Sequence, residues 1–137
     1  MINRIQNLLF NLGLATLATH ELDAVTQSEW HLLYILNSLP EQIAATSFVI
    51  IHVPFFAIIF WLGFNEKTRV REWARIVFAV FLIIHASLHK ALENHTLYTF
   101  NLPMSQGLIF GAGLLGCMYL ITVYIIHRAN IQTESYS

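Results

Sequence analysis

The stretch that decides the fold is residues 41–64, which read EQIAATSFVIIHVPFFAIIFWLGF. After Glu41, its only ionisable side chain is that of His52. At 1.5 Å per residue, a helix of this length rises roughly 36 Å, and the hydrocarbon core of a bilayer is about 30 Å thick. The stretch therefore predicts a helix that crosses a membrane.

Three other segments have a similar apolar character, and each is long enough to cross a bilayer as a helix. The first is the weakest of the four because Asn7 and Asn11 interrupt it. The predicted spans cover residues 4–24, 41–64, 70–93 and 104–127.

A shorter helix is expected between the first two spans. Thr26-Gln27-Ser28-Glu29 has the form of a capping box, a small hydroxyl residue followed three positions later by Glu. It predicts a helix over residues 27–38 that ends before Pro40. Since about 12 residues are too few to cross a bilayer, we expect this helix to lie at the membrane surface.

The composition of the chain agrees with a lipid environment. Its 137 residues are 56% hydrophobic and 11% charged, whereas an average soluble domain is roughly 25% charged. The net charge of −1 gives no basis for binding nucleic acid. We therefore expect one all-α domain over residues 1–137, a polytopic four-helix transmembrane bundle with a short interfacial helix between spans one and two.

The basic residues predict the orientation of this bundle. In a four-span arrangement only Lys90 falls on one side, and all the others fall on the opposite side: Arg4, Lys67, Arg69, Arg71, Arg75 and Arg128. The positive-inside rule places the second set, and with it both termini, in the cytoplasm. In span four, Gly107 and Gly111 have a spacing that lets helices approach closely, which favours a homo-oligomer through that face.

Histidines and carboxylates gather toward the opposite, outer end. Counting from the inner flank of each span, His52 and His85 lie roughly 20 Å up, His20 and Glu21 about 25 Å, and His89 and Asp23 about 27 Å. Ionisable groups at such depth are costly unless they are paired, face the bundle interior or are functional. The sequence therefore predicts one polar layer built from three helices.

This layer has the donors of a metal site. His85 and His89 are four residues apart, so both imidazoles lie on one helical face, and Glu93 extends that face by another turn. Imidazole and carboxylate are ligands of zinc, and carboxylates with histidines spread over several helices also suit iron. We expect a metal bound by residues drawn from one set: His20, His52, His85, His89, Asp23 and Glu93.

In this interpretation Glu21 is the catalytic general base, and the substrate is a lipid or another apolar small molecule near the outer leaflet. Two alternatives remain open. In the first, the polar layer is structural, in a non-enzymatic membrane subunit or assembly protein. In the second, it binds b-type haem through axial pairs, either His52 with His85 or His20 with His89. Residues at the rim, such as Glu29 and His95, are expected to be hydrated.

The motifs resemble those of a family of small uncharacterised bacterial membrane proteins with four spans. The resemblance rests on Thr19-His20-Glu21-Leu22-Asp23-Ala24, on Glu29-Trp30, on His52-Val53-Pro54 and on the stretch from His85 to His89. It covers nearly the whole chain and implies the four-span fold and the bacterial inner membrane. It implies no particular activity.

Overall fold

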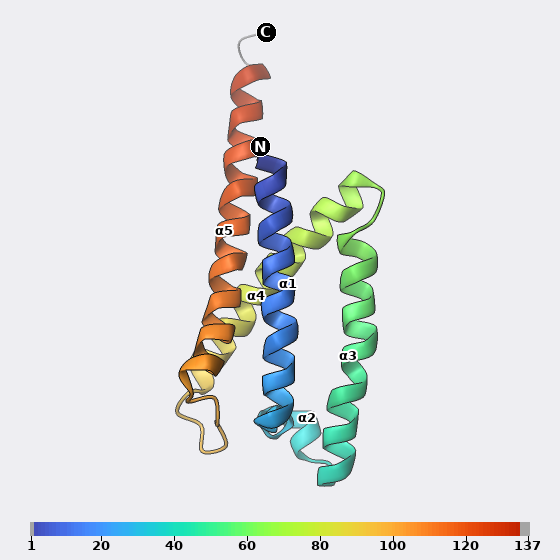
Figure 1. The fold of residues 1–137 in the computed structure, drawn as a ribbon, viewed down its shortest axis with the longest axis vertical. Helices are drawn as coiled ribbons and strands as arrows, with labels where there is room; N and C mark the ends of the chain where they lie inside the picture. The colour runs from blue at the N-terminus through green and yellow to red at the C-terminus, as the bar shows by residue number, and fades with distance from the viewer. Residues whose placement is uncertain (1, 135–137) are drawn as a thin grey trace.

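The computed structural model describes residues 2–134 and is helical, with no strand in that part of the chain. Four long helices run alternately up and down (Figure 1), so the start of the first helix and the loop between α3 and α4 lie at the same end. The helices are α1 (Ile2–Thr26), η1 (Glu29–Leu32), α2 (Tyr34–Asn37), α3 (Glu41–Gly63), α4 (Thr68–Leu92) and α5 (Pro103–Glu134).

The ends of the long helices follow from local chemistry. Pro40 precedes α3 and Pro103 opens α5, where a proline loses no helical hydrogen bond and its fixed φ suits a first turn. Glu41 places an acidic group in the first turn of α3, and His89 and Lys90 place basic groups in the last turn of α4. Both arrangements complement the helix dipole.

Three of the four long helices are long and apolar enough to cross a membrane: α3, α4 and the Pro103–Ala129 part of α5. The fourth, α1, has the necessary length but not the hydropathy. By length and composition, the prediction of four membrane-spanning helices is therefore met by three of them. The physical reason is the polar content of α1, which includes Asn7, Asn11, His20, Glu21 and Asp23.

The predicted interfacial helix over residues 27–38 is wrong as a continuous helix. The chain there forms two separate single turns, η1 and α2. The capping box does not form either, because α1 continues through Thr26, whose hydroxyl donates to the backbone carbonyl of Asp23 (2.7 Å). Ser28 precedes η1 with φ 57° and makes no side-chain cap.

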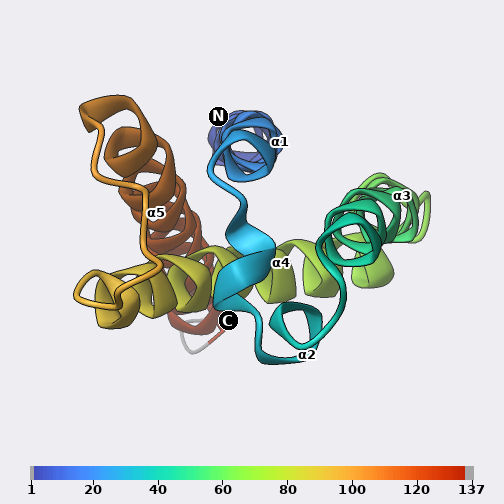
Figure 2. The same cartoon turned by 90° about the horizontal axis from the view of Figure 1, so that it is seen from below.

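Helix α4 crosses the other three long helices. Seen from below (Figure 2), α5, α1 and α3 are arrayed along α4, with α1 between the other two. Close packing of α4 on α5 depends on small residues, since a Cβ on Gly113 would lie 2.8 Å from the Cβ of Ala86. By contrast, a Cβ on Gly107 or Gly111 would meet nothing within 4 Å.

A buried arginine joins α1, α3 and α4 at the end that carries the α3–α4 loop. Arg75 donates from Nε to the carbonyl of Gly63 (2.8 Å) and from Nη1 to the side-chain oxygen of Asn7. Its guanidinium also lies 4.5 Å from the ring centroid of Phe10. Asn7, which weakens α1 as an apolar span, thus accepts a hydrogen bond from a buried charge.

Candidate metal centre

Three histidines from two helices meet at the opposite end of the molecule. His20 lies on the last turns of α1 and is fully buried, and His85 and His89 lie one turn apart on α4. The ring centroid of His20 is 4.9 Å from that of His85 and 5.1 Å from that of His89. The His85 and His89 centroids are 4.7 Å apart, as the four-residue spacing predicts.

The fourth member of this cluster is Glu29, which comes from the turn after α1. Ser28 adopts the left-handed conformation (φ 57°, ψ 46°), which is uncommon for a residue other than glycine. The turn reverses the chain, and Glu29 is buried with 8% of its surface exposed. Unusual backbone conformations of this kind concentrate at functional sites.

The turn that carries Glu29 is tied to α3. The indole nitrogen of Trp30 donates to one carboxylate oxygen of Glu41 (3.0 Å), and His31 Nε2 lies 2.8 Å from the other. The indole is itself buried and packs against Phe48. These contacts fix the position of η1 against the start of α3, and therefore the direction in which Glu29 points.

The four side chains are close enough together that they could hold a metal ion. One ligand atom from each of His20, Glu29, His85 and His89 lies within 4.8 Å of the other three. Glu29 Oε2 is 3.6 Å from His20 Nε2, and Glu29 Oε1 is 3.5 Å from His89 Nε2. Two ligands of a tetrahedral zinc, each about 2.0–2.1 Å from the ion, lie roughly 3.3 Å apart.

Several polar atoms of this cluster are buried without hydrogen-bond partners. They are Nδ1 and Nε2 of His20, Oε2 of Glu29, Nε2 of His85 and Nδ1 of His89. Leaving a buried polar atom unpaired costs roughly 1–3 kcal/mol. A ligand between the four converging side chains would satisfy these atoms.

Glu29 has the charge state that metal binding requires. Burial by itself would raise its pKa, but the hydrogen bond to the His89 imidazole, with smaller electrostatic contributions from His20 and His85, outweighs that effect, so the pKa of Glu29 lies below its usual value. The side chain is therefore a carboxylate at neutral pH, which is the form that coordinates metals.

Glu21 and His52 form a separate pair beside the cluster. His52 Nδ1 lies 2.6 Å from the carbonyl of Phe48 and must donate to it, because a carbonyl has no proton to give. The other ring nitrogen, Nε2, lies 2.7 Å from Glu21 Oε2. One proton is therefore shared between the imidazole and the carboxylate, and the bond links α1 to α3.

The structure distributes the sequence-predicted residues over different environments. It brings His20, His85 and His89 together, and it places His52 and Glu21 in the adjacent pair. Asp23 is buried, and its Oδ2 has no hydrogen-bond partner. Glu93 is exposed and binds Lys90 through both carboxylate oxygens (2.6 and 2.7 Å), so it lies apart from the cluster.

Sequence reasoning missed Glu29. Its position in a supposed capping box placed it at the hydrated start of a surface helix, and that expectation is wrong because the carboxylate is buried. No periodic pattern marks Glu29, since it follows a left-handed residue in a turn. The neighbouring Trp30, a large aromatic residue in the same segment, is the one signal that this turn packs inward.

Residues 6–126 match the family of unknown function DUF6713. The chain belongs to this family. DUF6713 carries no assigned activity, which agrees with the resemblance to an uncharacterised family but leaves the function to be argued from the site. No curated protein and no solved structure is similar enough to match the chain.

Proposed function

We propose that this chain is an integral membrane protein that binds a metal ion through His20, Glu29, His85 and His89. The observation that carries the proposal is the convergence of one ligand atom from each of these side chains to within 4.8 Å. Three imidazoles and one carboxylate suit zinc or iron, and shifts of roughly 1 Å would close the cluster to zinc-ligand separations.

The proposal includes α1 as a fourth membrane span. Two of its polar groups have partners in the protein, since Asn7 accepts from Arg75 and Glu21 pairs with His52, whereas Asn11 is exposed. With four spans, the basic residues at the start of α4 favour cytoplasmic termini. The family resemblance favours the bacterial inner membrane. The metal cluster then lies toward the outer face.

We also propose that the centre is the active site of a metal-dependent enzyme, a hydrolase or an oxidoreductase, acting on a lipid or another apolar molecule. A bound ion would supply Lewis acidity at a buried position. Glu21 and His52 share a proton next to the cluster and would accept or return a proton during turnover. Asp23, whose Oδ2 is buried and unpaired, would orient His20 from its own helix.

The two alternatives fit the geometry less well. A purely structural layer in a non-enzymatic subunit would close its hydrogen bonds, yet atoms of all four cluster side chains are buried and unpaired. For haem, the His20 and His89 rings already touch edge to face at 5.1 Å, and Phe100 packs against both. A planar macrocycle between two axial imidazoles would have to separate these rings.

Metal analysis of the purified full chain tests the proposal. We expect about one zinc or iron per chain after mild purification, and a loss of at least tenfold in the His85→Ala plus His89→Ala variant. His127→Ala is the matched control, because His127 is exposed and lies near the far end of α5. Wild-type protein without stoichiometric metal, before and after incubation with zinc or ferrous iron, would overturn it.

A further inference from the structure

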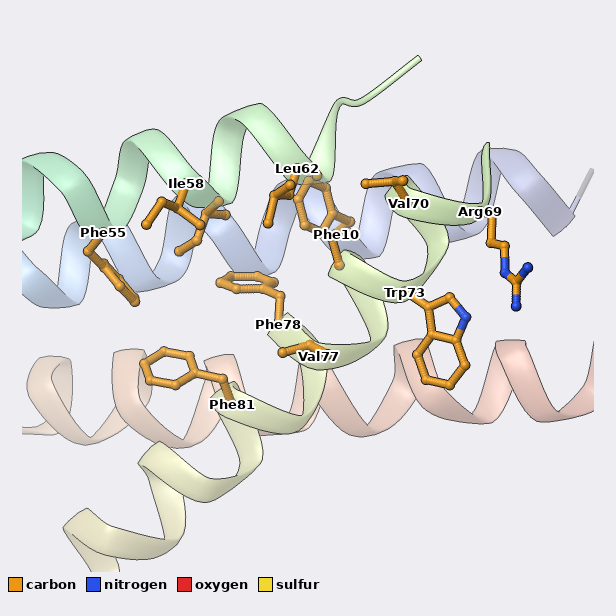
Figure 3. Close-up of a pocket in the computed structure, with 13 residues that line it drawn as sticks. Phe10, Phe55, Ile58, Leu62, Arg69, Val70, Trp73, Val77, Phe78 and Phe81 are labelled. Atoms are coloured by element: carbon orange, nitrogen blue, oxygen red, sulfur yellow. The ribbon is translucent and has the colours of Figure 1, made fainter. Parts of the chain in front are cut away.

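A deep apolar groove lies between α3 and α4, in the half of the molecule opposite the metal cluster. Its volume is about 630 Å³. Figure 3 shows Phe55, Ile58 and Leu62 of α3 on one side, α4 residues on the other, and Phe10 of α1 at the back. Several lining side chains are exposed, Val77 and Trp73 among them, so the groove opens away from the protein.

The two ends of the groove differ chemically. At the end nearest the α3–α4 loop it is lined by Arg69 and Trp73 (Figure 3). At the other end Phe55 and Phe81 close it, with ring centroids 5.5 Å apart. Behind that aromatic pair lie His52 and His85, whose ring centroids are 6.2 Å from Phe55 and 5.7 Å from Phe81 respectively.

Arg69 is the only charged residue among those that line the groove. Within residues 2–134 its guanidinium makes no ion pair and no hydrogen bond. Two other arginines of α4 differ, since Arg75 is buried and bonded, and Arg71 donates to the carbonyl of Asn65. An unpaired cation at the rim of an apolar groove complements a ligand that combines an anion with a hydrocarbon chain.

The dimensions of the groove suit a hydrocarbon chain. From Arg69 to Phe81, α4 rises roughly 18 Å, slightly more than one leaflet of a hydrocarbon core about 30 Å thick. A volume of about 630 Å³ over that length gives a mean cross-section of roughly 35 Å², or a width of about 7 Å. A groove of this length accommodates one extended hydrocarbon chain lying along α4.

We propose that this groove holds one acyl chain of an anionic phospholipid, with the lipid phosphate at Arg69. The chain lies against the phenyl and aliphatic side chains of α3 and α4 and ends at the Phe55–Phe81 pair. Trp73 lies beside Arg69 at the level of the headgroup, where amphipathic rings are favoured. This proposal does not rest on the metal centre, which lies beyond the aromatic pair.

Native mass spectrometry of the full chain in detergent tests the proposal, with equimolar dioleoylphosphatidylglycerol and dioleoylphosphatidylcholine as probes. We expect one phosphatidylglycerol retained per chain, with a preference of at least tenfold over phosphatidylcholine. Arg69→Ala should reduce that preference to below threefold. Arg128→Ala is the matched control, because Arg128 stacks on Tyr124 of α5 and lies outside the groove.

A second pair of variants separates the groove from the surface charge. Ala74→Trp places an indole in the groove and should lower lipid retention at least tenfold, whereas Ala57→Trp on the exposed face of α3 should leave it unchanged. Three outcomes would overturn the proposal. They are equal retention of the two lipids by the wild-type chain, unaltered lipid retention in Ala74→Trp, and displacement of the lipid by a second copy of the chain. Metal content should be the same in both tryptophan variants, so this test fails or succeeds independently of the metal site.

Discussion

The substitution Glu29→Gln separates the proposed centre from a structural polar layer. It keeps the size of the side chain and removes its charge, and it turns one of the two oxygens into an amide nitrogen that cannot bind a metal. The two oxygens lie 3.5 Å from His89 and 3.6 Å from His20. Whichever oxygen is replaced, the cluster loses its anionic ligand and retains three neutral imidazoles.

The size of the effect follows from comparison with weaker perturbations. Loss of a group that only orients a ligand typically lowers metal affinity 10–100-fold. Loss of the anionic charge of a ligand should therefore cost at least 100-fold, which is about 2.7 kcal/mol. With zinc at 1,000 times the wild-type Kd, the stabilisation by bound metal would fall from about 4.1 to about 1.4 kcal/mol.

Competition with a chromogenic chelator measures the affinity, and thermal unfolding with and without zinc measures the stabilisation. Glu93→Gln is the matched control, because Glu93 is exposed and bound to Lys90, and its affinity should change less than twofold. It also decides the sequence-based prediction that Glu93 is a ligand. If Glu93→Gln weakened zinc binding and Glu29→Gln did not, the assignment of the cluster would be refuted.

Three further predictions concern the fold and the Glu21–His52 pair. Arg75→Ala should lower the free energy of unfolding by about 1–3 kcal/mol, because it leaves the buried carbonyl of Gly63 unpaired and removes the hydrogen bond to Asn7, and thermal unfolding in detergent measures this loss. Gly116→Ala should cost about 1–3 kcal/mol, since its Cβ would lie 2.6 Å from a backbone oxygen of α4, whereas Gly111→Ala should be neutral in the monomer and alter only the oligomeric state. A double-mutant cycle of Glu21→Gln and His52→Gln should give a coupling energy of about 1–2 kcal/mol with unchanged metal content, and a coupling near zero would contradict the shared proton.

Helix location was predictable because hydrocarbon thickness and helical rise are fixed quantities. The same arithmetic placed His20, His85 and His89 in one layer, and the structure brings them together. Depth along a helix, however, gives no information about rotation around its axis or about how far helices splay. That is why His52, at a similar predicted depth, faces Glu21 in a separate pair.

The conformation of the turn between α1 and α3 could not be predicted from local sequence patterns. Thr26 and Glu29 match a capping box, which would start a new helix at Thr26. The same residues also allow α1 to continue through Thr26, and this is the structure observed. Tertiary contacts decide between them, since Trp30 reaches Glu41 from the other side of the turn. The ligand that completes the cluster therefore depends on packing between segments that no local rule connects.

The low hydropathy of α1 and its place between α3 and α5 have a common explanation. A helix with protein on several sides exposes less of its surface to lipid, so it needs fewer apolar residues and can carry polar groups that point inward. Asn7 meets Arg75 at one end, and Glu21 meets His52 toward the other. The helix with the lowest apolar content thus contributes polar residues at both ends of the bundle, as α4 does through Arg75 and His89. Apolar side chains are buried between these ends, Leu9, Leu14 and Leu17 among them, which keeps the structural arginine and the histidine cluster in separate environments.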